Sequence, residues 1–154
     1  QMVEFLIALA RADVRANAIW MDFLPLYEQV NETVPLAGRR WIIGHLGCAN
    51  GAQIASLANM GIAMTSHTNR YVYKHGAILR EQMGPARENE ITPLKSVLDS
   101  GIHIGMGTDN VPTSLWYPVW QAVTRYNRDI DGLRPNRRCR GSRRCAAPPS
   151  RARI

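Results

Sequence analysis

Three polar side chains that could carry chemistry stand at the ends of apolar, strand-like runs of this sequence. His45 closes the run WIIGH, His67 follows GIAMTS, and Asp109 closes IHIGMGT. Imidazole and carboxylate groups transfer protons during hydrolysis and bind divalent cations. Because the carboxyl ends of parallel strands meet at one edge of a sheet, we expect these side chains to share one rim.

Each of the three also has a purely structural interpretation. A single histidine at a strand end is commonly a structural residue, and an aspartate before a helix is commonly its N-cap. Asp109 could cap a helix near residues 111–114, with Pro112 in an early turn. The coincidence of three such residues favours a functional role, most of all for Asp109. His103 lies inside its run and is expected to face the helix layer, whereas His75 is expected to face solvent.

The runs that must position these side chains alternate with helix-like segments. Helical spacing of apolar residues covers residues 2–12, 23–34, 50–60, 92–100 and 114–128, with Thr92 as the expected N-cap of the fourth segment and Pro93 in its first turn. The strand-like runs are VRANAIW, RRWIIGH, GIAMTSH and IHIGMGT. This alternation predicts right-handed βαβ units, and therefore an α/β fold whose four strands form a parallel sheet in chain order.

The positive charge of the chain is concentrated at its end. The net charge is +7, but residues 134–154 hold eight arginines and no acidic residue, so the preceding residues carry a net charge of −1. The same segment has almost no large apolar side chain, which predicts a disordered Arg- and Pro-rich tail over 133–154 after a domain over 1–132. Its two cysteines, Cys139 and Cys145, lack further ligands at zinc spacing, so no metal site is expected there.

Two features bear on the location of the protein. No apolar run is long enough to span a membrane, and the amino-terminal residues lack the basic region and the cleavage site of a signal peptide. Cys48 is expected to be a buried free thiol, which is typical of a reducing compartment. We therefore expect a cytoplasmic protein without a membrane partner.

Two longer segments, residues 39–73 and 92–125, carry a family resemblance. RRWIIGHLGCANGAQIASLANMGIAMTSHTNRYVY and TPLKSVLDSGIHIGMGTDNVPTSLWYPVWQAVTR resemble the carboxyl-terminal half of amidohydrolase-superfamily enzymes, in particular the amidohydrolase 3 (YtcJ-like) group. The likeness spans about residues 5–132. It implies the last four β/α units of a TIM (β/α)8 barrel. It also implies hydrolysis of a non-peptide C–N bond, such as an amide or N-acyl group, or of a related ester.

The resemblance assigns roles to particular residues. The GTD motif matches Asp109 to the family's catalytic aspartate, a general base and then acid beside a metal-activated water. The histidine that ends the family's sixth strand is a metal ligand and matches His45. Asn17 stands where the family has a fifth-strand histidine ligand, which leaves one divalent metal, expected to be zinc, or none. The residues expected to face the small-molecule substrate are His67, Asn69 and Trp116, the last of which could instead pack the final helix on the barrel.

The family's remaining site residues have no counterpart in this sequence. The His-x-His pair of the first strand and the carboxylate or carbamylated lysine of the fourth are absent, and Gly44 replaces the glutamate of a common Glu-His pair. We therefore expect a fragment that begins just before the fifth strand. Alone it is expected to be inactive, and its expected partner is the remainder of the barrel or another subunit.

Two other functions remain open. A nucleic-acid-binding protein could use the arginine-rich tail, although the tail has no aromatic side chain for base stacking and the preceding residues have no basic excess. A non-catalytic half-barrel would need a partner to cover its open sheet edges. Because the resemblance stops near residue 132, the tail is either a natural basic extension or an out-of-frame reading of GC-rich DNA.

Overall fold

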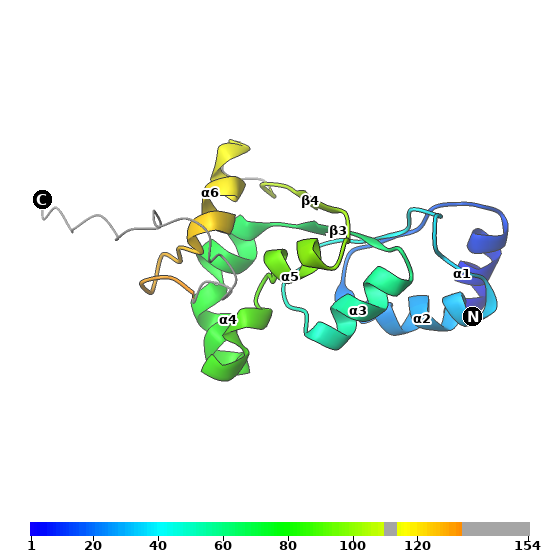
Figure 1. Cartoon of the computed structure of the whole chain (residues 1–154), viewed down its shortest axis with the longest axis horizontal. Helices are drawn as coiled ribbons and strands as arrows, with labels where there is room; N and C mark the ends of the chain where they lie inside the picture. Colours follow the sequence, from blue (N-terminus) through cyan, green and yellow to red (C-terminus); the bar gives the residue numbers. More distant parts are fainter. Residues whose placement is uncertain (110–113, 134–154) are drawn as a thin grey trace, which may run out of the picture.

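A parallel four-stranded sheet forms the centre of the molecule (Figure 1). In the computed structural model, which describes residues 1–109 and 114–133, the strands are β1 (Asn17–Ala18), β2 (Ile42–Ile43), β3 (Ala63–Ser66) and β4 (Ile104–Met106). They lie in the order β1-β2-β3-β4, and every neighbouring pair is parallel. This arrangement confirms the predicted α/β fold and strand order, and it places the carboxyl ends of all four strands on one edge.

Each strand is shorter than the apolar run that predicted it. β2 ends at Ile43 because His45 turns into the left-handed region, with a φ of 52°, and donates its backbone N–H to the hydroxyl of Thr65 rather than to a strand carbonyl. An apolar run predicts burial, whereas a strand also requires a paired backbone on both sides. The runs therefore mark the buried segments better than they mark the strand ends.

Four α-helices cover one face of the sheet. They are α1 (Met2–Arg11), α2 (Leu24–Thr33), α3 (Gly51–Asn59) and α5 (Leu94–Asp99), and the short 3-10 helix η1 (Met21–Phe23) leads into α2. Their apolar sides share one core, in which Tyr27, Trp41, Ile43 and Met64 are at most 1% exposed. On the other face Gly105 is exposed. One covered face and one open face are what part of a TIM-barrel wall has when the barrel is not closed.

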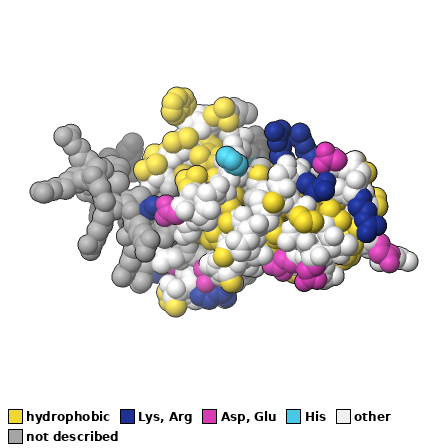
Figure 2. All heavy atoms as spheres, turned by 45° about the vertical axis from the view of Figure 1, so that its right-hand side comes forward, with side chains coloured by type: hydrophobic (Ala, Val, Ile, Leu, Met, Phe, Trp, Pro, Cys, Tyr) yellow, Lys and Arg dark blue, Asp and Glu magenta, His cyan; other side chains and the backbone are white. Residues whose placement is uncertain are grey.

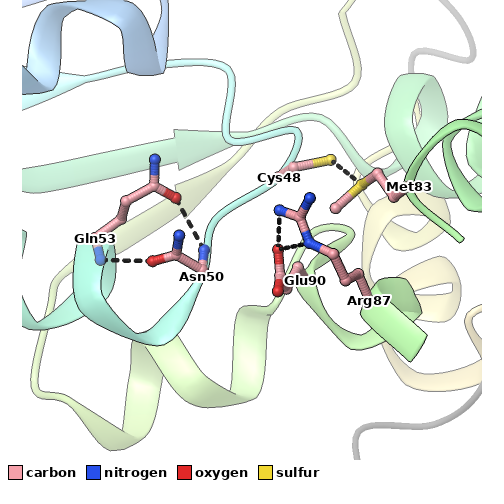
Figure 3. A network of polar contacts seen from close by, with 6 residues as sticks. All are labelled: Cys48, Asn50, Gln53, Met83, Arg87 and Glu90. Atoms are coloured by element: carbon pink, nitrogen blue, oxygen red, sulfur yellow. Dashed lines mark hydrogen bonds and ion pairs between the residues drawn. The ribbon is translucent and has the colours of Figure 1, made fainter.

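Polar contacts fix the connection from β2 to α3 (Figure 3). Asn50 caps α3: its side chain accepts a hydrogen bond from the N–H of Gln53, and the Gln53 side chain accepts one from the N–H of Asn50, both at 2.9 Å. Just before this capping box, Cys48 is only half-buried, and its Sγ lies 3.4 Å from Sδ of Met83. The reciprocal cap sets the direction in which the chain leaves the strand end.

The remaining elements pack beside the carboxyl end of β3. They are the π-helix η2 (Asn69–Lys74), α4 (Gly76–Met83), the 3-10 helix η3 (Pro85–Glu90) and α6 (Trp116–Thr124). Val72, Ile91 and Leu133 form their buried cluster. Leu133 is 3% exposed, although the sequence prediction placed it in the tail. The packed part of the chain therefore extends at least to Leu133.

Two predictions about helix ends were wrong. Thr92 does not cap α5: its backbone is left-handed, with a φ of 43°, and its hydroxyl donates to the carbonyl of Gly47. The last helix ends at Thr124 rather than near residue 128, because Arg125 also turns left-handed. The buried Arg125 guanidinium then donates hydrogen bonds to backbone carbonyls before α5. In both places a tertiary contact outweighs the local helix signal.

Some predictions fall on residues outside the described ranges. They concern Pro112 after Asp109 and the arginine-rich segment from residue 134 onward. The predicted disorder of that segment and the nucleic-acid alternative therefore stay predictions. Within the ranges that the structure describes, no helix has the length and apolar character needed to cross a membrane.

Candidate active site at the carboxyl ends of the strands

His45 and His67 meet beyond the carboxyl ends of the neighbouring strands β2 and β3. Their ring centroids are 4.4 Å apart, and the His45 ring centroid is also 5.1 Å from that of Trp20, which follows β1. The parallel register explains the meeting, because Ile43 pairs with Met64 and each histidine comes shortly after its strand residue. The structure thus brings together two of the three strand-end residues that the sequence singled out.

Two glycines make room for this arrangement. A Cβ on Gly107 would lie 3.1 Å from Cε1 and 3.2 Å from Nδ1 of the His67 ring, closer than side chains normally approach. A Cβ on Gly44 would lie 3.1 Å from Oγ1 of Thr65, so a glutamate in its place would require a local shift. The Nδ1 atom of His67 is buried and has no hydrogen-bond partner in the described part of the chain.

The surroundings of His45 favour its neutral imidazole. Removal from water lowers the pKa of His45, and the nearby His67 and Arg70 lower it further, whereas Asp109 acts in the opposite direction. The hydroxyl of Tyr71 lies 3.5 Å from Nδ1 of His45, and burial raises the pKa of that hydroxyl. A neutral imidazole has a free lone pair with which it can bind a cation or accept a proton.

Asp109 follows β4 and carries a partly exposed carboxylate. Its side chain is 27% exposed, and Oδ2 lies 3.8 Å from Nη1 of Arg70. Its backbone is left-handed, with a φ of 50°, as is that of His45. Such conformations concentrate at functional sites. Because α6 begins at Trp116 with Leu115 as its N-cap residue, Asp109 does not cap that helix.

Three residues at this rim were absent from the sequence prediction: Trp20, Arg70 and Tyr71. The Arg70 guanidinium carbon lies 5.8 Å from the ring centroid of Trp20 and 5.6 Å from that of Tyr71. Trp20 could have been found by the strand-end rule, because it closes VRANAIW. Arg70 and Tyr71 gave no such signal, since they belong to the π-helix η2, a rare element that is frequent at functional sites.

Two residues predicted to face the substrate have different surroundings. Asn69 is 3% exposed, and its Oδ1 accepts a hydrogen bond from Nε2 of Gln121 at 3.3 Å, so its amide lies in the buried contact between η2 and α6. Trp116 is 81% exposed. Its two predicted roles, facing the substrate or packing the last helix on the barrel, therefore stay predictions. Figure 2 shows hydrophobic side chains standing out over α6.

Asn17 lies at the opposite end of the sheet from His45. It pairs with Ile42, three residues before His45, which corresponds to about 10 Å along a strand. Asn17 borders an open pocket of about 750 Å³ at the amino-terminal ends of the strands, where Lys and Arg side chains gather (Figure 2). Basic side chains in its lining are Arg15, Arg40 and His103. His103 is thus exposed on the open side and does not face the helix layer as predicted.

The described residues do not contain a complete set of metal ligands. Within residues 1–109 and 114–133, no group of three His, Cys, Asp or Glu side chains is arranged to hold a cation. The imidazoles of His45 and His67 fit two positions of a tetrahedral site, because one is held neutral and the other has an unpartnered buried nitrogen. Any further ligands would come from outside the described part of the chain.

Comparisons with known proteins agree with this architecture. A family model described as the amidohydrolase family matches residues 9–146, and thus continues into the segment that the sequence predicted to be a separate tail. Among solved structures, the chain is similar to an uncharacterised metal-dependent hydrolase from Pyrococcus horikoshii OT3, with 22% sequence identity and a TM-score of 0.60. A search of curated proteins found no match.

The structural likeness covers 80% of this chain but 26% of the Pyrococcus chain. This chain therefore spans about a quarter of the length of that protein. At this level of identity the likeness is evidence about the fold. Together with the four parallel strands and their one-sided helix cover, it confirms the predicted partial TIM-barrel-like architecture.

Proposed function

The chain belongs to the amidohydrolase family, and on this premise we propose that it contributes to the hydrolysis of a non-peptide C–N bond, such as an amide or N-acyl group, in a small molecule. One observation carries the proposal: the His45 and His67 rings lie 4.4 Å apart at the edge where β4 delivers Asp109. Proton-transferring and cation-binding groups from three neighbouring strands therefore converge on one rim.

Asp109 is the proposed proton carrier. It takes a proton from the water that attacks the carbonyl carbon and then delivers a proton to the leaving nitrogen. Its partly exposed side chain is accessible to both groups, and it has no capping role at α6 that would account for its position. Its left-handed backbone, shared with His45, supports the same assignment because function can retain a strained conformation.

His45 and His67 are the proposed protein ligands of a divalent cation, preferably Zn²⁺. When bound, such a cation lowers the pKa of the water molecule beside it toward neutral pH. The low pKa of His45 keeps its lone pair available, and Gly107 holds the His67 ring in place. The missing ligands would come from the remainder of the barrel or from another subunit. The described sheet has open edges at β1 and β4 for such a partner.

A cobalt titration of the full chain tests this proposal, with Cys139→Ser and Cys145→Ser as the common background. The half-buried thiol of Cys48 is then the same in every variant. Co²⁺ bound by imidazoles gives visible absorption bands. Loss of an outer-shell partner of a ligand typically costs about tenfold to a hundredfold in metal affinity, and loss of a ligand should cost at least as much. We expect that loss in His45→Ala and in His67→Ala. His103→Ala is the matched control, because His103 lies at the other end of the sheet.

Equal cobalt affinity in all four proteins would contradict the metal assignment and would favour the non-catalytic half-barrel. A second measurement addresses the reaction itself. In an assembly of this chain with the residues that complete its site, amides and N-acyl compounds are expected to be hydrolysed. Inertness of that assembly toward every amide and ester, despite intact cobalt binding, would contradict the proposed reaction but not the ligand assignment.

A further inference from the structure

Tyr71 is held in one position at the rim. It is 8% exposed, and its backbone N–H donates to the carbonyl of His67 at 3.1 Å. The ring lies against the backbone of Gly47, so that a Cβ there would come within 3.0 Å of Cδ1 and of Cε1. The carbonyl of Gly47 in turn accepts hydrogen bonds from the N–H and the hydroxyl of Thr92, which fix its position. The place of the Tyr71 hydroxyl is therefore determined by its surroundings.

The Tyr71 hydroxyl approaches one nitrogen of the His45 ring. Its oxygen lies 3.5 Å from Nδ1. This distance is long for a hydrogen bond, but hydrogen bonds within a site are often long until the site is complete. Within residues 1–109 and 114–133, the Tyr71 hydroxyl is the hydrogen-bond partner of the His45 ring, and it has no second partner there. Nε2 is then the ring nitrogen that remains open to a ligand.

The position of one proton decides whether His45 can use Nε2. A neutral imidazole carries a proton on one nitrogen and a lone pair on the other, and the hydrogen bond made by one nitrogen sets which of them is protonated. If the Tyr71 oxygen accepts a hydrogen bond from Nδ1–H, the lone pair lies on Nε2. If the hydroxyl instead donates to Nδ1, the proton lies on Nε2 and neither nitrogen is available.

We propose that Tyr71 is a positioning residue that accepts a hydrogen bond from Nδ1–H of His45 and thereby reserves Nε2 for a divalent cation. Ligand histidines commonly donate their second ring N–H to a neighbouring acceptor, which orients the ring and raises its basicity. This inference rests on the proposed function, because it takes His45 as a metal ligand. Gly47 contributes by leaving space for the Tyr71 ring.

A packing role for Tyr71 is the competing explanation. Its ring fills the space beside Gly47, and the guanidinium carbon of Arg70 lies 5.6 Å from the ring centroid. Tyr71→Phe keeps the ring and removes only the hydroxyl. A packing role therefore predicts that this change affects neither the tautomer of His45 nor the binding of a metal, whereas the positioning role predicts that it affects both.

Nitrogen-15 NMR of the full chain measures the tautomer without a metal. The spectra are recorded well above pH 6.5, the ordinary pKa of histidine, so that the His45 ring is neutral. We expect the proton on Nδ1 in the unaltered chain and a smaller share of that tautomer in Tyr71→Phe. Tyr73→Phe is the matched control, because it makes the same change in η2 at a ring that contacts Tyr126, and it should leave the His45 signals unchanged.

A cobalt titration in the Cys139→Ser, Cys145→Ser background measures the consequence. Tyr71→Phe should lower the affinity by about tenfold to a hundredfold, the usual effect of removing a partner of a metal ligand, and Tyr73→Phe should not. A second variant reaches the same hydroxyl from another side. Gly47→Ala should displace the Tyr71 ring and weaken cobalt binding, whereas Gly51→Ala should leave it unchanged, because a Cβ on Gly51 would meet nothing within 4 Å.

Three results would overturn the inference: a proton on Nε2 of His45 in the unaltered chain, the same tautomer in Tyr71→Phe, or a cobalt affinity that depends on His45 but not on the Tyr71 hydroxyl. Its failure can be told apart from that of the proposed function. Cobalt binding that is lost in His45→Ala but unchanged in Tyr71→Phe would retain the ligand and reject the role of Tyr71. A tautomer that depends on Tyr71, in a chain whose cobalt affinity does not depend on His45, would retain the hydrogen bond and reject the metal assignment.

Discussion

The His67 ring lies directly against the backbone of Gly107, so that a Cβ on Gly107 would come within 3.1 Å of Cε1. The two residues belong to segments that leave adjacent strands, β3 and β4. The absence of a side chain at Gly107 therefore determines where the imidazole can sit.

Gly107→Ala is expected to displace the His67 ring, because the added methyl group would overlap it. The change should weaken cobalt binding by about tenfold, the lower end of the effect of disturbing the residues that support a metal ligand. Gly105→Ala is the matched control on the same strand, since its Cβ would meet only Cγ2 of Thr65, at 4.0 Å. Equal cobalt affinities and unchanged His67 NMR signals in both variants would show that the ring is not confined by Gly107.

The protonation of His45 gives a prediction about pH. Its pKa in the folded protein is below the ordinary value of 6.5, mainly because of desolvation and then because of His67. The unfolded chain therefore takes up a proton at a higher pH than the folded chain does. The contribution of His45 to stability is present above pH 6.5 and is lost as the pH falls from there toward the lowered pKa.

An NMR titration of the His45 ring protons checks this direction. His67→Gln removes the electrostatic effect of the neighbouring imidazole, so the pKa of His45 should rise in that variant while desolvation still lowers it. His103→Gln, at the far end of the sheet, should leave the titration of His45 unchanged. A measured pKa of His45 above 6.5 in the unaltered chain would contradict the expected effects of desolvation and of His67.

Residue periodicity predicted the sheet because burial is a local property of the sequence. The runs RRWIIGH and GIAMTSH marked β2 and β3, and the strand-end rule then brought His45 and His67 together. The rule did not select Asn17, which the family resemblance alone assigned, and it was not applied to the residue that closes VRANAIW. In VRANAIW that position belongs to Trp20.

Residues outside this pattern could not be found from sequence because tertiary contacts set their roles. Arg70 reaches the rim through the wider turn of a π-helix, which apolar spacing does not reveal. Asn69, next to it, follows a strand end as the rule requires, yet its amide is buried against Gln121. Composition is limited in the same way at Leu133. The arginine-rich composition of the segment that begins there predicted a tail, yet the Leu133 side chain is part of the buried cluster with Val72.

Leu133 provides a test of where the packed domain ends. A chain that stops at residue 136 is expected to keep the free energy of unfolding of the full chain, because the segment beyond it has few side chains that could form a core. In that shortened chain, Leu133→Ala should cost about 2 kcal/mol, the lower end for a buried leucine.

The matched control is Leu98→Ala, because Leu98 is 61% exposed and its truncation should cost well under about 1 kcal/mol. Urea denaturation of the four proteins gives the comparison. A loss of more than about 1 kcal/mol on removal of residues 137–154 would show that this segment contributes to the fold.

Asp109 is the residue on which the catalytic proposal depends most. In an assembly of this chain that hydrolyses a substrate, Asp109→Asn keeps the size of the side chain but removes the proton acceptor. General acid–base catalysis contributes about a hundredfold to ten-thousandfold, so kcat should fall by at least about a hundredfold. Because the side chain is partly exposed and its ion pair with Arg70 is long, the free energy of unfolding should change by less than about 1 kcal/mol.

Asp129→Asn is the matched control, since Asp129 carries a 52% exposed carboxylate that also pairs with an arginine, Arg128. It should leave both kcat and stability unchanged. If Asp109→Asn kept full turnover but lowered stability by the ~1 kcal/mol typical of a lost helix cap, its carboxylate would be structural. A fall in kcat without that loss of stability would assign the carboxylate to proton transfer.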